Sequence, residues 1–288
     1  MNSAISHERQ PAARIRDAAE LARIARLLRR DVINLVAPTG QGYVQQGLGA
    51  ADLFAVLYFA EMRIDPTDPR WPDRDRFLLS TAHNTAIFYA TLAARGLVDR
   101  NLVRDYCKDG SVFEVNASER VGTAIEATLG SLGQGLSVGI GMALAARRRT
   151  SDSRIYVVLG DGELQEGQLW EAALYAGSAG LSNLCLIIDY NSMQVEGHID
   201  KVVSVEPVAE KFKAFGWASE NIDGHDIPAL LTALDQARGR DRPTCLVATT
   251  IAGKGVPSLE GILAHNLKLP ADVAEEALVA LADAKERT

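Results

Sequence analysis

Two oxygen-bearing side chains, Asp161 and Asn191, are the clearest candidates for chemistry in this 288-residue chain. Asp161 lies in Gly160-Asp161-Gly162, directly after the apolar run 155–159, and Asn191 follows the apolar run 184–189. If both runs are parallel strands, their carboxyl ends lie at one edge of the sheet, where the two side chains can share a cation. Oxygen ligands suit Mg²⁺, and the flanking glycines let backbone N–H groups approach phosphate oxygens. The spacing therefore predicts a metal-bridged diphosphate site.

This segment has other interpretations. A dinucleotide-binding fingerprint needs a third glycine where Gln165 stands, and the residues around Lys254 do not form a phosphate-binding P-loop. Judged on the tripeptide alone, an ordinary turn between a strand and a helix, with Asn191 as a turn residue, is the better interpretation. The diphosphate hypothesis therefore needs support from the rest of the chain.

The elements that position these residues follow from the pattern of apolar side chains. From residue 154 onward, short β-branched runs alternate with longer helical periods, which predicts an α/β fold with a parallel sheet and helices on both of its faces. The predicted strands are 155–159, 184–189, 217–222 and 244–249, and the helices near them are 167–180, 205–215, 227–238 and 271–285. Earlier in the chain we expect helices at 14–36, 50–61 and 83–95, a Gly- and Gln-rich loop at 41–49, and a buried loop and helix at 127–146.

Composition and charge exclude several classes of protein. With 47% hydrophobic and 23% charged residues, the chain has the balance of an ordinary globular protein. Its 30 basic and 37 acidic residues give a net charge of −7, which argues against binding of nucleic acid. Cys107, Cys185 and Cys245 do not suit a disulfide framework or a zinc site. We see no targeting or membrane-spanning segment, and we expect a cytoplasmic protein with no membrane contact. We expect one domain over residues 1–288, with residues 1–40 as an N-terminal helical arm.

Motifs along nearly the whole chain resemble the transketolase family. The segment 160–167, followed by Trp170-Glu171-Ala172 and by Asn191, is similar to the thiamine diphosphate signature as that family has it. The resemblance continues in the family's order through Trp71-Pro72-Asp73-Arg74-Asp75-Arg76-Phe77, Gly130-Ser131-Leu132-Gly133-Gln134-Gly135, Ala214-Phe215-Gly216-Trp217, Asp223-Gly224-His225-Asp226 and Gly253-Lys254-Gly255. It implies the thiamine diphosphate-binding fold, thiamine diphosphate and Mg²⁺ as cofactors, and a transferase that moves a two-carbon ketol or acyl-anion unit.

The resemblance also implies roles for single residues. The side chains of Asp161 and Asn191 and the carbonyl of Met193 match the ligands that hold Mg²⁺ against the diphosphate. His83 and His265 match histidines near the cofactor, and Glu166 matches a glutamate that couples the two active sites of a dimer. The resemblance thus implies catalytic roles for His83, Glu166 and His265, and cofactor contacts for these three and for Asn191, Gly130, Leu132, Gly160 and Gly162.

The length of the chain implies a partner. Full transketolases carry a second, pyrimidine-binding domain with the glutamate that activates the cofactor. This chain stops at Thr288, where the first domain would end, so it resembles the N-terminal, diphosphate-binding subunit of a split transketolase. The expected partner is a pyrimidine-binding subunit of the C-terminal type, in an α2β2 assembly, and we expect no activity of the chain alone.

Two departures from the family's pattern fall at the substrate end. The family usually has histidines where this chain has Tyr43 and Asn116. Neither replacement can carry a proton near neutral pH, because tyrosine titrates at about 10 and an amide does not titrate. We interpret both as substrate-site residues that accompany a changed donor, either an unusual sugar phosphate or a small 2-keto acid. Ordinary ketol transfer, with the missing contacts supplied by the partner, is the alternative.

Two other functions fit parts of the sequence. Ser137 lies in a G-x-S-x-G sequence with Asp223 and His225 downstream, as in some serine hydrolases, although a loop rather than a strand precedes it. The chain could also be a non-catalytic scaffold subunit of the same kind of complex. Retention of Asp161, Asn191 and Glu166 argues against a scaffold, because a buried carboxylate is costly without its cation.

Overall fold

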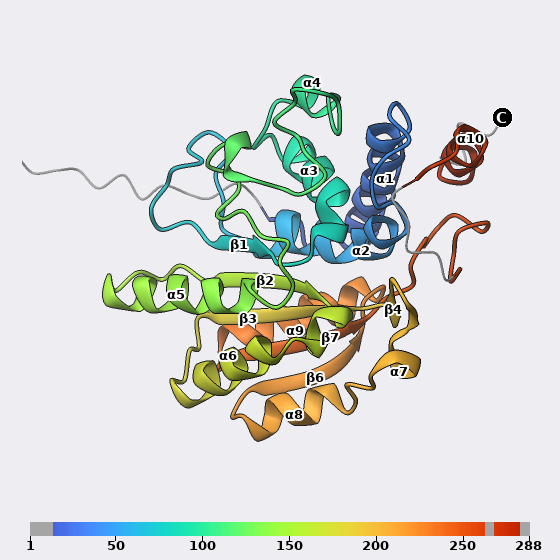
Figure 1. Ribbon diagram of the computed structural model, residues 1–288. Helices are drawn as coiled ribbons and strands as arrows, with labels where there is room; N and C mark the ends of the chain where they lie inside the picture. The colour runs from blue at the N-terminus through green and yellow to red at the C-terminus, as the bar shows by residue number, and fades with distance from the viewer. Residues whose placement is uncertain (1–13, 263–267, 283–288) are drawn as a thin grey trace, which may run out of the picture.

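A five-stranded parallel sheet lies at the centre of the computed structural model, which describes residues 14–262 and 268–282 (Figure 1). The strand order is β1-β2-β3-β7-β6, and every neighbouring pair is parallel. The strands are β1 (Arg76–Leu79), β2 (Ile155–Gly160), β3 (Leu184–Tyr190), β6 (Ala218–Asp223) and β7 (Thr244–Thr249). The carboxyl ends of all five strands therefore lie at one edge of the sheet, as the sequence predicted.

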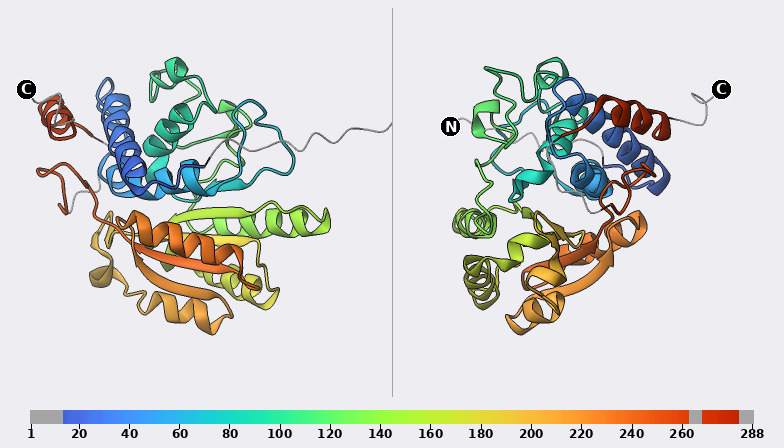
Figure 2. Two further views of the ribbon diagram at one scale, coloured as in Figure 1. Left: turned by 180° about the vertical axis from the view of Figure 1, so that it is seen from behind. Right: turned by 45° about the vertical axis from the view of Figure 1, so that its right-hand side comes forward.

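Helices cover both faces of the sheet because both faces of its strands are apolar. Along β2, Tyr156 and Val158 join one hydrophobic core, and Ile155 and Val157 join the other. The first core is completed by α1 (Ala18–Val36), α2 (Gln45–Val56), α3 (Thr85–Ala94), α9 (Ile227–Arg238) and α10 (Ala271–Ala280). The second core is completed by α5 (Gly135–Arg148), α6 (Gly167–Ser178) and α8 (Val208–Ala214). Figure 2 shows the two helical layers on either side of the sheet, and the predicted α/β architecture is confirmed.

Short elements connect the layers. They are a π-helical turn (Leu57–Glu61), three 3₁₀ turns (Ala82–Asn84, Glu119–Val121 and Asp161–Gln165), α4 (Arg100–Val103), a hairpin of β4 (Met193–Gln194) and β5 (Gly197–His198), and α7 (Ile199–Val202). The helix predicted at 227–238 has the bounds that the structure shows, and those predicted at 14–36, 83–95, 167–180 and 205–215 correspond to observed helices with somewhat shorter spans. The helix predicted at 271–285 is observed as Ala271–Ala280, and residues 283–285 lie outside the described part of the chain. The segment 127–146 is a loop that leads into α5, as expected.

The strand β1 was missing from the prediction. Its four residues begin with Arg76 and follow a segment rich in Asp, Pro and Arg, so no β-branched run marks it. Pairing with β2, with Arg76 opposite Ile155, defines the strand and buries Phe77 and Leu78. The strand predicted at 217–222 is also displaced by one residue, because Trp217 leaves the ladder and its indole donates to the Ala173 carbonyl at 2.8 Å.

The prediction of a loop at 41–49 was wrong in its second half, because α2 begins at Gln45. Two glycines inside this helix suggested a loop, but they allow close packing instead. A Cβ on Gly49 would lie 2.9 Å from the carbonyl oxygen of Ile251, and one on Gly47 would lie 3.4 Å from Ile87. Tertiary contact therefore determines the start of this helix more strongly than the low helical propensity of glycine does.

The helix α1 belongs to the first core. It begins after Asp17, whose side chain accepts the N–H of Ala19, and it buries Leu21, Leu28 and Val32 against its neighbours. Residues 1–13 lie outside the described part of the chain. Among the described residues, no helix is both long and apolar enough to cross a lipid bilayer.

Candidate functional site

A pocket of about 220 Å³ opens at the carboxyl edge of the sheet, beside the ends of β2 and β3. It contains most of the residues that the sequence singled out. They are His83, Leu132, Gly160, Asp161, Gly162, Glu166, Asn191 and Met193. Other residues of its wall are Gln46, Thr81, Asn84, Glu163, Gln165, Asp189, Gln194, Val195 and Glu196.

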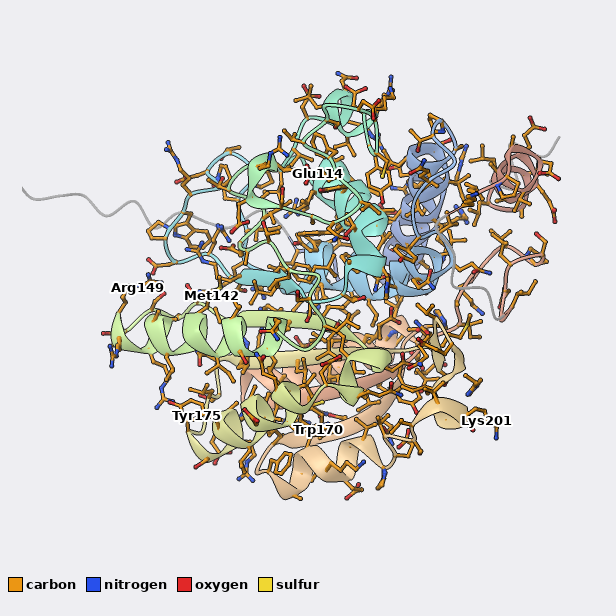
Figure 3. The ribbon with its side chains drawn as sticks, in the orientation of Figure 1. Glu114, Met142, Arg149, Trp170, Tyr175 and Lys201 are labelled. Carbon is orange, nitrogen blue, oxygen red and sulfur yellow. The ribbon has the colours of Figure 1, made fainter. Side chains whose placement is uncertain are left out.

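The turn that carries Asp161 is held from outside the pocket. The indole Nε1 of Trp170 donates to the Leu164 carbonyl at 2.8 Å, so the first turn of α6 fixes the end of the turn Asp161–Gln165. Trp170 itself packs on Phe212 of α8, with ring centroids 5.6 Å apart. Figure 3 shows Trp170 among the side chains beneath the sheet. The position of Asp161 thus depends on the packing of two helices.

The Asp161 carboxylate links the ends of β2 and β3. It is 1% exposed and accepts the backbone N–H of Ser192 at 2.5 Å. Burial, together with the nearby charge of Asp189, raises the pKa of Asp161 to about 8, although N–H groups of Ser192, Gly162 and Asn191 act in the opposite direction. Ser192 has a φ of 63°, a strained value for a residue other than glycine. The loop after β3 is therefore folded back onto the carboxylate.

Asn191 and Met193 are held in the same loop. The Asn191 side-chain oxygen accepts the N–H of Met193 at 3.0 Å, which closes a turn two residues long. Because Asp161 accepts backbone N–H groups from Asn191 and Ser192, the predicted ligands meet at one place in the pocket wall. A carboxylate, an amide oxygen and a backbone carbonyl form an oxygen donor set that suits Mg²⁺.

Acidic side chains outnumber basic ones in the described wall of this pocket, where His83 is the one basic residue. Five carboxylates line it and no lysine or arginine does; the acids are Asp161, Glu163, Glu166, Asp189 and Glu196. Among described residues, no three or more His, Cys, Asp or Glu side chains come together in a way that could hold a metal by themselves. A diphosphate here would be repelled unless a cation intervened, and that cation would need amide, carbonyl or phosphate oxygens to complete its coordination. The residues present therefore fit a cation that is held jointly by protein and ligand.

His83 lies in the turn that follows β1, and Tyr43 lies against it. Their ring centroids are 4.5 Å apart in an edge-to-face arrangement at 62°. Burial raises the pKa of the Tyr43 phenol, so that group stays protonated and can donate a hydrogen bond at neutral pH. His265 lies outside the described residues.

Asn116 and Gly130 contact each other but do not line the pocket. A Cβ on Gly130, whose φ is +144°, would lie 3.3 Å from the Asn116 amide nitrogen. The pocket wall instead receives Leu132 from the same loop. The Asn116 side chain therefore lies close to the backbone of the loop 130–135 at Gly130.

Sequence reasoning missed a second buried carboxylate in the pocket. Asp189 is 1% exposed and accepts the Asn84 amide at 2.9 Å and the Thr250 hydroxyl at 2.5 Å. Burial raises its pKa, and the two hydrogen bonds partly offset that effect. An aspartate that closes an apolar strand two residues before Asn191 was a signal in the sequence, but its partners come from distant segments.

Comparison with known proteins shows what this pocket belongs to. Residues 18–279 match the family described as transketolase, thiamine diphosphate binding domain. The chain belongs to the transketolase family. The predicted family and the predicted class, a transketolase-like transferase of two-carbon units, are confirmed. The pocket at the sheet edge is thus part of a thiamine diphosphate-binding domain.

The relatives of this transketolase-family chain include proteins of similar length. It is 38% identical to the 6-deoxy-6-sulfo-D-fructose transketolase subunit SqwG of Clostridium sp. (strain MSTE9), over 91% of this chain and 96% of that protein. It is 35% identical to an apulose-4-phosphate transketolase subunit of Phocaeicola vulgatus, over 87% of this chain and 89% of that protein. These two relatives of similar length are both named as subunits.

Solved transketolases share the fold but are longer. The structure of transketolase from Campylobacter jejuni matches with a TM-score of 0.83 and 30% identity, over 90% of this chain and 42% of that one. A transketolase variant from Pichia stipitis matches with the same score and identity, over 91% of this chain and 40% of that one. The chain thus spans less than half the length of these two solved transketolases.

The serine hydrolase alternative is wrong. Ser137 lies in the first turn of α5, where its hydroxyl accepts the Gln168 amide at 3.1 Å. His225 cannot act as its base, because both ring nitrogens have other partners. Nδ1 lies 2.8 Å from an Asp52 oxygen, and Nε2 accepts the N–H of Ile251 at 2.9 Å.

Proposed function

We propose that this chain is the diphosphate-binding subunit of a two-chain, thiamine diphosphate- and Mg²⁺-dependent transketolase. The observation that carries the proposal is the buried Asp161 carboxylate, which lies with Asn191 and Met193 in a pocket whose described wall has five carboxylates and no lysine or arginine. A pocket with five carboxylates and no lysine or arginine is an unfavourable environment for a diphosphate unless a divalent cation is present. The family match and the resemblance of these residues to the family's metal ligands support the same conclusion.

Within this proposal the chain's residues bind and orient the cofactor. Asp161 and Asn191 provide side-chain oxygens and Met193 its carbonyl to Mg²⁺, while Gly160 and Gly162 leave room for the diphosphate beside the backbone. When bound, thiamine diphosphate supplies the electron sink for two-carbon transfer. The proposed residues beside its rings and the substrate are His83, Leu132, Glu166, Gly130 and His265.

The partner in this proposal is a pyrimidine-binding subunit of the C-terminal type, in an α2β2 complex. It is supported by two relatives that are named as transketolase subunits and that the match covers over 96% and 89% of their own length. Glu166, at the start of α6, would then couple the two cofactor sites. We also propose that the chain acts as a single domain in the cytoplasm, consistent with three cysteines that are all free.

The proposed donor is a sugar phosphate or a small 2-keto acid, with Tyr43 and Asn116 as the residues that adapt the site to it. Tyr43 supports this because its ring packs on His83. Asn116 would act indirectly, because its amide lies close to the backbone of Gly130. Relatives named for 6-deoxy-6-sulfo-D-fructose and for apulose-4-phosphate indicate that donors other than the usual ketoses occur in this group.

The test is reconstitution with a neighbouring chain of the pyrimidine-binding type. We expect two-carbon transfer only when both chains, thiamine diphosphate and Mg²⁺ are present, and comparison of xylulose 5-phosphate, apulose 4-phosphate, 6-deoxy-6-sulfofructose and pyruvate identifies the donor class. Efficient transfer by the purified chain alone would refute the two-chain proposal. Absence of thiamine diphosphate binding to the assembled complex, measured by calorimetry, would leave the scaffold alternative.

A further inference from the structure

Glu163 is a buried carboxylate on which three hydrogen-bond donors converge. Its side chain is 2% exposed, and one oxygen accepts both the Ser80 hydroxyl at 2.5 Å and the Gly133 N–H at 2.9 Å. The other oxygen accepts the Gly160 N–H at 3.1 Å. These donors come from the end of β1, from the loop 130–135 and from the last residue of β2. One side chain thus joins three segments that are far apart in the sequence.

The loop 130–135 packs closely against this carboxylate and its neighbours. Gly135 donates its N–H to the Ser80 hydroxyl at 3.2 Å, which extends the hydrogen-bond network by one member. Gly133 has a φ of +76°, and a Cβ there would lie 2.7 Å from the Cβ of Glu166. The backbone therefore approaches so closely that only glycine fits at this position. Leu132, between these contacts, forms part of the pocket wall.

The network requires a carboxylate rather than an amide. Three donors point at two oxygens, and no salt bridge to Glu163 occurs among the described residues. Two backbone N–H groups and one hydroxyl offset part of the cost of burying this group, and burial still raises the pKa of Glu163. A glutamine has one accepting oxygen, and its amide nitrogen would face an N–H or hydroxyl donor. An isosteric glutamine would thus lose at least one contact and add a donor facing a donor.

We propose that Glu163 is a positioning residue that fixes the loop 130–135, and with it Leu132 and the Gly160 turn, in the geometry needed to bind the cofactor. The proposal rests on the proposed function, because the loop matters only if the pocket holds thiamine diphosphate. Glu163 acts through the loop backbone on one side and through Gly160, which adjoins Asp161, on the other. It therefore aligns the two ends of the cofactor site with each other.

The first test compares Glu163→Gln with a matched control, Glu61→Gln. Glu61 is also a buried glutamate, but it accepts the Tyr156 hydroxyl at 2.5 Å and pairs with Arg238 at 2.9 Å near the opposite end of β2. In the full chain without cofactor, we expect faster hydrogen exchange at residues 130–135 in Glu163→Gln and unchanged exchange there in Glu61→Gln. Unchanged exchange in a folded Glu163→Gln variant would overturn the proposal. Hydrogen exchange at residues 130–135 tests the role of Glu163 separately from the proposed function, because it is measured without the cofactor.

The second test measures binding to the assembled complex by calorimetry. We expect Glu163→Gln to raise the Kd for thiamine diphosphate with Mg²⁺ by about ten- to a hundredfold, the range that loss of hydrogen bonds to a charged group gives. Glu61→Gln should lower thermal stability without this change in Kd. A wild-type complex that binds no thiamine diphosphate would refute the proposed function instead.

Ser80→Ala separates the two sides of the network and replaces Glu163→Gln if that variant does not fold. It removes the hydroxyl that joins Glu163 to Gly135 but leaves the Gly160 contact in place. We expect weaker binding of thiamine diphosphate and unchanged binding of inorganic pyrophosphate with Mg²⁺. Equal binding of both ligands by Ser80→Ala and wild type would contradict the proposed role of the loop contacts.

Discussion

At the scale of single residues, the site depends on side chains placed where water is largely excluded. The Asp161 carboxylate is buried, lies near Asp189, and has its pKa raised to about 8 by burial first and by that neighbour second. A group in such surroundings costs free energy unless it serves a ligand. Tyr43 differs, because its ring contacts His83 rather than the proposed metal ligands.

Asp161→Ala should abolish metal-dependent binding of the cofactor. Loss of a residue that only supports a metal ligand typically costs ten- to a hundredfold in affinity, so loss of a ligand should exceed about a hundredfold. Calorimetry of thiamine diphosphate with and without Mg²⁺ measures the effect. The exposed Asp152 provides the control variant Asp152→Ala, which should bind as the wild type does. Metal-dependent affinity that survives in Asp161→Ala would show that the assignment is wrong.

Tyr43→His should change the use of donors but not the binding of metal. The substitution replaces a neutral phenol on His83 with a second imidazole, which can carry a proton near neutral pH. We expect a change in kcat/KM between donors of about tenfold or more, the scale of one altered hydrogen bond to substrate. Steady-state kinetics with xylulose 5-phosphate and pyruvate, together with Mg²⁺ titration, separate these effects. Identical donor preference in Tyr43→His and wild type would count against a specificity role for Tyr43.

At the scale of elements, a buried polar cluster joins the helices of the first core to the sheet edge. Arg29 on α1 pairs with Asp52 on α2 at 2.5 Å, and His225 after β6 binds the same carboxylate at 2.8 Å. The other ring nitrogen of His225, Nε2, accepts the Ile251 N–H at 2.9 Å, so this ring connects Asp52 to the segment after β7. Burial alone would raise the pKa of Asp52, but His225 and Arg29 lower it overall. This cluster keeps α1 and α2 in register with the strand ends that carry the site.

Asp52→Ala should lower the free energy of unfolding by about 3–5 kcal/mol at pH 7, because it leaves Arg29 buried without a counter-charge. The difference from wild type should shrink in acid. A carboxylate whose pKa is lowered in the folded state stabilises the protein above its usual pKa of 3.8, and that stabilisation is lost as pH falls through the lowered value. Urea unfolding of both proteins from pH 7 to pH 3 measures it. The exposed Glu20, paired with Arg23, offers Glu20→Ala as a control with little expected effect.

At the scale of the whole molecule, the pocket has an exposed apolar rim. Val195 and Leu132 line the pocket and yet are 69% and 37% exposed. The proposed partner must reach the cofactor with its glutamate, so it must cover this edge of the sheet. Apolar side chains at the centre of such a contact commonly carry much of the binding energy. The rim therefore belongs to the surface on which we expect the pyrimidine-binding subunit to dock.

Val195→Asp should weaken association of the two chains by about tenfold or more, since it places a charge in a contact that excludes water. Val279→Asp is a matched control, because Val279 is equally exposed, at 69%, but lies on α10 away from the pocket. Sedimentation of mixtures of the purified chains measures both. If the two variants associate with the partner equally well, the partner docks elsewhere.

Local pattern in the sequence was enough for the outline of this fold. Runs of β-branched residues ending in Gly160-Asp161-Gly162 and before Asn191 predicted two adjacent parallel strands, and the structure has them as β2 and β3. Such signals are readable because side-chain periodicity and turn chemistry depend on neighbours a few residues away. The same local motifs identified the family, and the structure places most of the predicted residues in one pocket.

The sequence by itself determined where the two site strands end and which residue types follow them. Only the tertiary structure decided which distant groups complete the site. The pairing of β1 with β2, the contact of Gly49 in α2 with Ile251, the Asp189–Asn84 hydrogen bond and the contacts of Glu163 with Ser80 and Gly133 all join segments tens of residues apart. No local pattern specifies such contacts, because their free energy arises only when packing removes water from both partners at once.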